Sequence, residues 1–131
     1  MGQQQLLLIV LGVIIAGIAV VVGINLFSSS AAESNRTAVI SDLHHIAHLA
    51  QSYYKRPVSY GGGNGSFAGF VIPTPLVSTL DGEFSVSTAG TATQITIQGI
   101  GLETGNDGSV PLKYQMTVFA NNTNFTLVKL N

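Results

Sequence analysis

The sequence predicts an α+β protein in which one long N-terminal helix, about residues 3–54, packs against a C-terminal antiparallel sheet of four or five strands. Three observations predict this fold. The chain opens with an unbroken apolar run, apolar residues then continue at helical spacing up to Pro57, and the spacing changes to two beyond that proline. A chain of 131 residues has room for one small domain beside such a helix.

The first half of the predicted helix is apolar on all sides. Only apolar residues and glycines lie between Leu6 and Ile24, and no charged side chain comes before Glu33. As a helix this run is about 28 Å long, close to the thickness of a bilayer core. We expect residues 1–27 to form this hydrophobic half and residues 28–131 to hold the amphipathic half together with the sheet. The helix can bend or melt locally at its glycines, which are Gly12, Gly17 and Gly23.

A cleaved signal peptide is the first alternative for this segment. Signal peptides have a basic N-terminal region and an apolar region of about 7–15 residues. Ser30, Ala31 and Ala32 resemble a cleavage site, but no Lys or Arg precedes the apolar run, which is also longer than usual. We therefore expect the segment to be retained.

The second half of the helix carries an apolar stripe on one side. Its members are spaced four, three, four and three apart: Val39, Leu43, Ile46, Ala50 and Tyr53. Lys55 and Arg56 suit a helix C-terminus, and Pro57 ends the helix. This stripe is the only available cover for one face of a sheet.

The remaining chain is predicted to form strands, and we expect no helix after residue 57. Residues 60–65 are predicted to be a flexible connector, and turns are expected at residues 89–91 and 121–123. The candidate strands include residues 67–72, 84–86, 95–97, 112–118 and 125–130.

Composition excludes several classes of function. The chain has no cysteine, so disulfides and thiolate metal sites are excluded. Its net charge of −1 and pI of about 6.2 give no bulk attraction to nucleic acid or to anionic lipid. We find no catalytic triad, carboxylate pair or cofactor fingerprint, so we expect neither an enzyme nor a bound cofactor, and no nucleic-acid partner.

The N-terminal segment resembles that of a type IV pilin. The residues that carry the resemblance are Met1-Gly2-Gln3-Gln4-Gln5 and the run Leu6–Ile15, which is similar to the apolar start of mature pilins. The order of helix, loop and sheet then covers the whole chain. The resemblance implies a major pilin, a structural subunit that rests in the inner membrane by its N-terminal helix and then polymerises with identical copies into a thin extracellular filament.

The resemblance also implies processing and partners. A prepilin peptidase would remove a leader and methylate the new N-terminus, and the pilus assembly machinery would build a surface filament. The resemblance leaves open whether this filament serves adhesion, motility, DNA uptake or another role. The residues that it places in assembly are Met1, Gln5, Gly12, Gly17 and Gly23. Most pilins carry Glu at the fifth mature position, where this chain has Gln5 if Met1 is the first mature residue; Gln3 is the alternative start.

Two other functions remain open. One is a pseudopilin of a type II secretion-like system. The other is a monomeric extracytoplasmic binding domain anchored by one membrane-spanning helix, although such anchors usually show Lys or Arg on the cytoplasmic side.

Candidate sites outside the helix each have an ordinary structural explanation. His44 and His48 are four apart, a spacing that can chelate a metal, while His45 points elsewhere; we favour structural or subunit contacts for all three. Tyr53-Tyr54-Lys55-Arg56 can stack on single-stranded nucleic acid, but helix termination is the simpler explanation. A loop with calcium-type oxygen ligands, which we favour as a turn, contains Glu103, Asn106 and Asp107. Four glycosylation sequons begin at Asn35, Asn64, Asn121 and Asn124.

Overall fold

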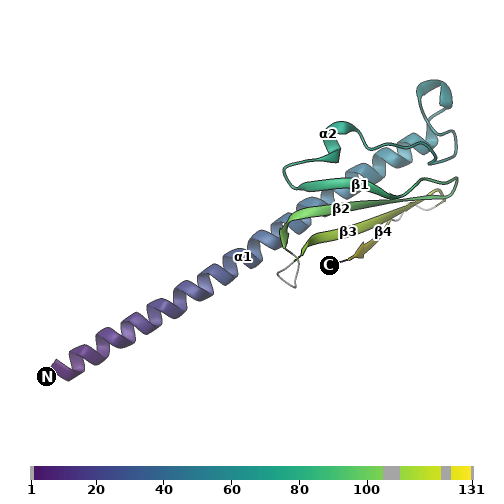
Figure 1. Cartoon of the computed structure of the whole chain (residues 1–131). Coiled ribbons are helices and arrows are strands. Elements are labelled where there is room, and N and C mark those ends of the chain that lie inside the picture. Colours follow the sequence, from purple (N-terminus) through teal and green to yellow (C-terminus); the bar gives the residue numbers. More distant parts are fainter. Residues whose placement is uncertain (1, 105–109, 122–124, 131) are drawn as a thin grey trace. The chain divides into compact units, whose positions relative to one another are not determined.

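The computed structural model describes residues 2–104, 110–121 and 125–130, and these form the predicted α+β arrangement (Figure 1). A long helix, α1 (Gly2–Lys55), is followed by a four-stranded antiparallel sheet within the described part of the chain. Its strands are β1 (Gly82–Thr88), β2 (Gln94–Thr104), β3 (Pro111–Phe119) and β4 (Thr126–Lys129). Internal contacts divide the chain into two compact units, Met1–Glu33 and Ser34–Asn131, and α1 contributes to both.

The second unit contains a complete hydrophobic core. The C-terminal half of α1 lies along one face of the sheet (Figure 1) and buries Val39, Leu43, Ile46 and Ala50, as the stripe predicts. The strands contribute the side chains that alternate toward the helix, among them Phe84, Ile95, Ile97, Leu112, Tyr114, Met116 and Val118. The helix therefore covers one face of the sheet, and the other face carries mainly polar residues.

Two details of the predicted stripe are different in the structure. Ala47 joins the buried set, because it lies four residues after Leu43 and three before Ala50, on the same face of the helix. Tyr53 is only half-buried, and its hydroxyl donates a hydrogen bond to the carbonyl of Ala68 at 2.9 Å. Tyr54 packs against the core in its place.

The glycine-rich segment that the sequence suggests as a connector caps the C-terminus of α1. Gly63 donates to the carbonyl of Tyr53 at 2.8 Å, Asn64 to that of Arg56 at 3.0 Å, and Gly65 to that of Tyr54 at 2.8 Å. These bonds satisfy carbonyls that have no partner within the helix. Gly65 has a φ of +87°, and a Cβ on Gly63 would collide with the carbonyl oxygen of Ser66. This geometry requires glycine.

The prediction of a strand at residues 67–72 is wrong. Gly69 has a φ of +82°, and the amide of Phe70 donates to the carbonyl of Phe67 at 3.1 Å, so the chain turns there instead of extending. Phe67 and Ile72 are nevertheless both buried. They are five residues apart, an odd spacing that one continuous strand would place on opposite faces.

The expectation of no helix beyond residue 57 is also wrong. A short 3-10 helix, η1 (Val58–Tyr60), follows Pro57, and a single turn, α2 (Thr74–Val77), follows Pro73. Both begin directly after a proline, whose fixed φ favours the start of a helical turn. Because each is very short, neither leaves a repeating apolar pattern in the sequence.

Candidate assembly surface

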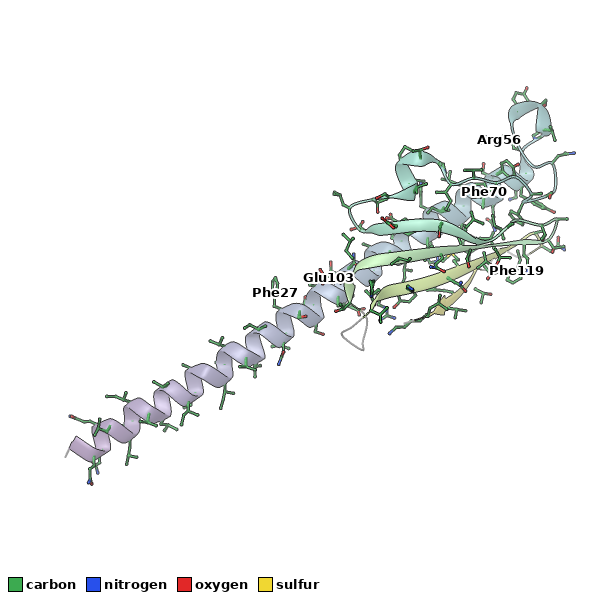
Figure 2. The ribbon with its side chains drawn as sticks, viewed as in Figure 1. Phe27, Arg56, Phe70, Glu103 and Phe119 are labelled. Carbon is green, nitrogen blue, oxygen red and sulfur yellow. The ribbon has the colours of Figure 1, made fainter. Side chains whose placement is uncertain are left out.

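The first unit of the structure presents apolar side chains on all sides of one helix. Every residue from Gly2 to Ser30 is exposed, and its large apolar side chains range from 49% exposed at Val22 to 78% at Phe27. Figure 2 shows these side chains projecting in every direction around α1, with Phe27 labelled. Helices that are apolar all round are normally buried in a large protein or in a membrane. By length and composition this helix can cross a bilayer, and none of its most apolar stretch is buried.

The glycines of this helix have open space around them. A Cβ built on Gly12, Gly17 or Gly23 would meet nothing within 4 Å. Gly12 and Gly23 fall on one stripe of small residues together with Ala16 and Ala19, since the four are spaced four, three and four apart. Sequence reasoning picked out the glycines singly and missed the stripe. Gly17 lies on a different side of the helix, so small residues allow close approach of another helix from two directions.

The segment before the apolar run has amides and no charge. Gln3, Gln4 and Gln5 are exposed and helical, and each offers both a donor and an acceptor. Met1 lies outside the described residues. At position 5 the chain therefore provides a hydrogen-bonding group without the negative charge of a carboxylate.

Two of the three histidines, His44 and His48, are part of the packing around Phe125. The rings of His44 and His48 lie edge-on to this phenylalanine, with centroid separations of 5.9 and 5.3 Å. Nδ1 of His44 also lies 2.8 Å from the carbonyl oxygen of Ile40. His45 is exposed. No group of three side chains suited to a metal ion occurs within the described residues.

The other two candidate sites are not assembled as binding sites in the described residues. The rings of Tyr53 and Tyr54 pack against Phe70 and Phe67, at 5.5 and 4.8 Å, so they are already occupied by aromatic neighbours. Of the loop with calcium-type ligands, Asn106 and Asp107 lie outside the described residues, and only the exposed Glu103 can be placed.

The sequon at Asn35 has a structural role that the sequence did not reveal. Its Nδ2 donates to the carbonyl of Asp81 at 2.8 Å, and its Oδ1 accepts from the amides of Leu102 and Glu103 at 3.1 and 3.3 Å. The side chain thus ties α1 to the start of β1 and the end of β2. A glycan would be attached to the same nitrogen, which argues against modification here.

The remaining sequons differ in exposure. Asn64 lies in the capping loop with a φ of +48° and is exposed, and Asn121 is exposed after β3. Asn124 lies outside the described residues. Asn64 and Asn121 are the described sequon asparagines whose side chains are accessible.

Comparison with known proteins adds no relative: no family model, no curated protein and no solved structure matches this chain. The assignment of function therefore rests on the chain itself.

The role of Asn35 can be tested by Asn35→Ala. The change leaves the carbonyl of Asp81 and the amides of Leu102 and Glu103 without this partner, so we expect a loss of about 1–3 kcal/mol in the free energy of unfolding. All four tyrosines lie in the second unit, so near-UV circular dichroism of the detergent-solubilised chain follows its unfolding alone. Asn121→Ala, in an exposed turn, serves as the matched control and is expected to change stability by less than about 0.5 kcal/mol. Equal stability of the two variants would show that the hydrogen bonds of Asn35 contribute nothing.

Proposed function

We propose that this chain is a structural subunit, a major pilin that polymerises through its N-terminal helix into a type IV pilus-like surface filament. One observation carries the proposal. The apolar helix of the first unit is exposed on every side, while the second unit has a full core without it. A surface of this kind requires lipid or other apolar helices around it.

In the proposed function, the apolar helix is surrounded first by lipid and later by other apolar helices. Before assembly, the helix rests in the inner membrane, where its backbone hydrogen bonds are satisfied internally. In the filament, it exchanges lipid for the same helix of other copies, and the small residues at positions 12, 16, 17, 19 and 23 permit close packing. Identical copies that contact one another head to tail form an open helical polymer when the rotation between them does not close.

The rival is a monomeric domain anchored by one spanning helix. The length of the apolar segment suits that function equally well. One feature favours the filament: the segment has small residues on two sides of the helix. A lone anchor gains nothing from glycine, which is about 1 kcal/mol worse than alanine inside a helix.

The glycines separate the two functions experimentally. Gly12→Leu or Gly17→Leu should leave membrane insertion intact, because a larger apolar residue is tolerated in lipid. In a packed bundle either leucine holds neighbouring helices apart, so we expect at least a tenfold drop in filament yield, equivalent to about 1.4 kcal/mol. Yield is measured by electron microscopy and by quantification of sheared surface protein.

Val13→Leu is the matched control for the glycine variants. It adds apolar volume beside Gly12 at a position that already holds a branched side chain, and it should leave filament yield unchanged. Normal filament yield and thermal stability in both glycine variants would favour the monomeric anchor.

The amide at position 5 provides a second test. Without a carboxylate, assembly cannot depend on a charge pair between this residue and a neighbour's N-terminal amine. We therefore expect Gln5→Leu to retain filament yield within about threefold of the wild type, the factor that corresponds to loss of one modest hydrogen bond. The measurement is filament yield at matched levels of membrane protein. Complete loss of filaments at normal membrane levels would show that the amide itself is essential.

A further inference from the structure

The described sheet has two open edges. Its strand order is β1-β2-β3-β4, so β1 and β4 are the outer strands. Beyond β1 there is one isolated bridge, between Ser78 and Glu83, with the amide of Thr79 donating to the carbonyl of Gly82 at 2.9 Å. Among the described residues, no strand pairs with the outer edge of β4. Unpaired edges of this kind are templates for pairing with another chain.

The open part of the β1 edge is four residues long. The carbonyl of Gly82 points away from β2, toward Thr79, and alternate residues in a strand point their backbone groups to the same side. The backbone groups of Phe84 and Val86 therefore face this outer edge, and no described residue beyond the bridge at Ser78 pairs with it. Beyond the bridge at Glu83, the positions from Phe84 to Ser87 are free to accept a strand.

An apolar groove follows this edge. It has a volume of ≈ 570 Å³ and lies between β1 and the irregular segment before α2. Its walls include Phe70, Ile72, Val77, Phe84 and Val86, and none of its lining residues is charged. The groove thus suits a short strand that carries aliphatic side chains.

The other edge of the same sheet provides such a strand. β4 comprises four exposed residues, Thr126 to Lys129, and includes Leu127 and Val128, which are 38% and 46% exposed. Leu127 lies opposite Met116, on the helix-facing side of the sheet, and Val128 lies opposite Gln115 on the other side. The length of β4 matches the open part of the β1 edge.

The two edges also carry opposite charges. Asp81 and Glu83 lie at the β1 margin, whereas Lys113 and Lys129 lie on β3 and β4 at the other margin. Two acidic edges or two basic edges would repel each other, but the β4 edge of one copy attracts the β1 edge of another. This complementarity identifies the occupant of the groove as a second copy of the chain.

We propose that β4 of one subunit adds to the β1 edge of the adjacent copy, so that their sheets join edge to edge. The proposal rests on the proposed function, in which the N-terminal helices bring identical copies alongside one another. β1 and β4 run in opposite directions within each sheet, because all three strand pairings are antiparallel. A copy in the same orientation therefore brings its β4 antiparallel to β1.

The register follows from the rows of the sheet. One row of paired residues, on the helix-facing side of the sheet, contains Val86, Ile97, Met116 and Leu127. Continuing this row into the adjacent copy places that copy's Leu127 beside Val86, at the groove. A row on the other face contains Ser85, Gln98, Gln115 and Val128, and it brings the adjacent copy's Val128 beside Ser85. A third row contains Glu83, Ile100 and Lys113, and it continues to Leu130, whose amide donates to the carbonyl of Lys113 at 2.9 Å. Continuing this row places the adjacent copy's Leu130 beside Glu83, with Lys113 of that copy one strand farther along the same row.

Disulfide cross-linking tests this register in the full chain. The sequence has no cysteine, so Ser85→Cys combined with Val128→Cys introduces the only two thiols. Within one copy these positions are three strands apart, about 14 Å, which is too far for a disulfide. Filaments and membranes of the double variant are oxidised and separated by gel electrophoresis without reductant. They should give a ladder of covalent oligomers, whereas each single variant should give dimers at most.

A matched pair of thiols distinguishes edge pairing from random collision. Gln98→Cys with Val128→Cys places both groups on the same face, but Gln98 lies in the inner strand β2, one strand away from the β1 edge. This pair should give at least tenfold fewer oligomers longer than dimers. Equal ladders from the two pairs, or no ladder from Ser85→Cys with Val128→Cys in either filaments or membranes, would overturn the proposal.

Charge reversal provides an independent readout. Glu83→Lys or Lys113→Glu alone should lower the ladder yield, because each sets like charges at the two margins that meet, and the two together should restore it. Failure of the combined variant to recover would contradict the charge pairing. Microscopy of wild-type filaments reports separately on the proposed function: filaments without a ladder leave that function intact and reject edge pairing.

Discussion

The apolar surface around the first half of α1 is the constraint on which the other conclusions depend. Each leucine, isoleucine or valine in this segment would gain about 1.5–3 kcal/mol from leaving water. Within the described residues, none of the most apolar stretch of this helix is buried. A helix with such a surface is normally covered by lipid or by other helices.

The second unit has a hydrophobic core of its own. Val39, Leu43 and Ile46 bury fully against the sheet, so the C-terminal half of α1 acts as one layer of a two-layer domain. Two polar devices hold this half in place: Asn35 ties it to the sheet at one end, and the glycine loop caps it at the other. One helix thus serves two environments, with the change near residue 33.

The sequence predicted those parts of the structure in which apolar residues recur at a regular spacing. Val39, Leu43, Ile46 and Ala50 could be placed in the core because helical spacing fixes one face. Alternation did the same for the strands that became β1, β2 and β3. The expected strand at residues 125–130 became β4, whose four residues are exposed. The prediction of a strand at residues 67–72 was wrong because Gly69 adopts a positive φ. The spacing of apolar residues does not reveal such a turn. The amide network of Asn35 and the capping role of Gly63 depend on segments brought together by folding, so neither could be inferred from local pattern.

The central claim is that residues 1–27 are the polymerisation element and that the remaining chain folds without them. Its most direct test is the chain that lacks residues 1–27, analysed by sedimentation and by near-UV circular dichroism of its four tyrosines. The account predicts a water-soluble monomer whose tyrosine spectrum matches that of the full chain and which forms no filaments. Filaments from the shortened chain, or loss of its tyrosine signal, would contradict the account.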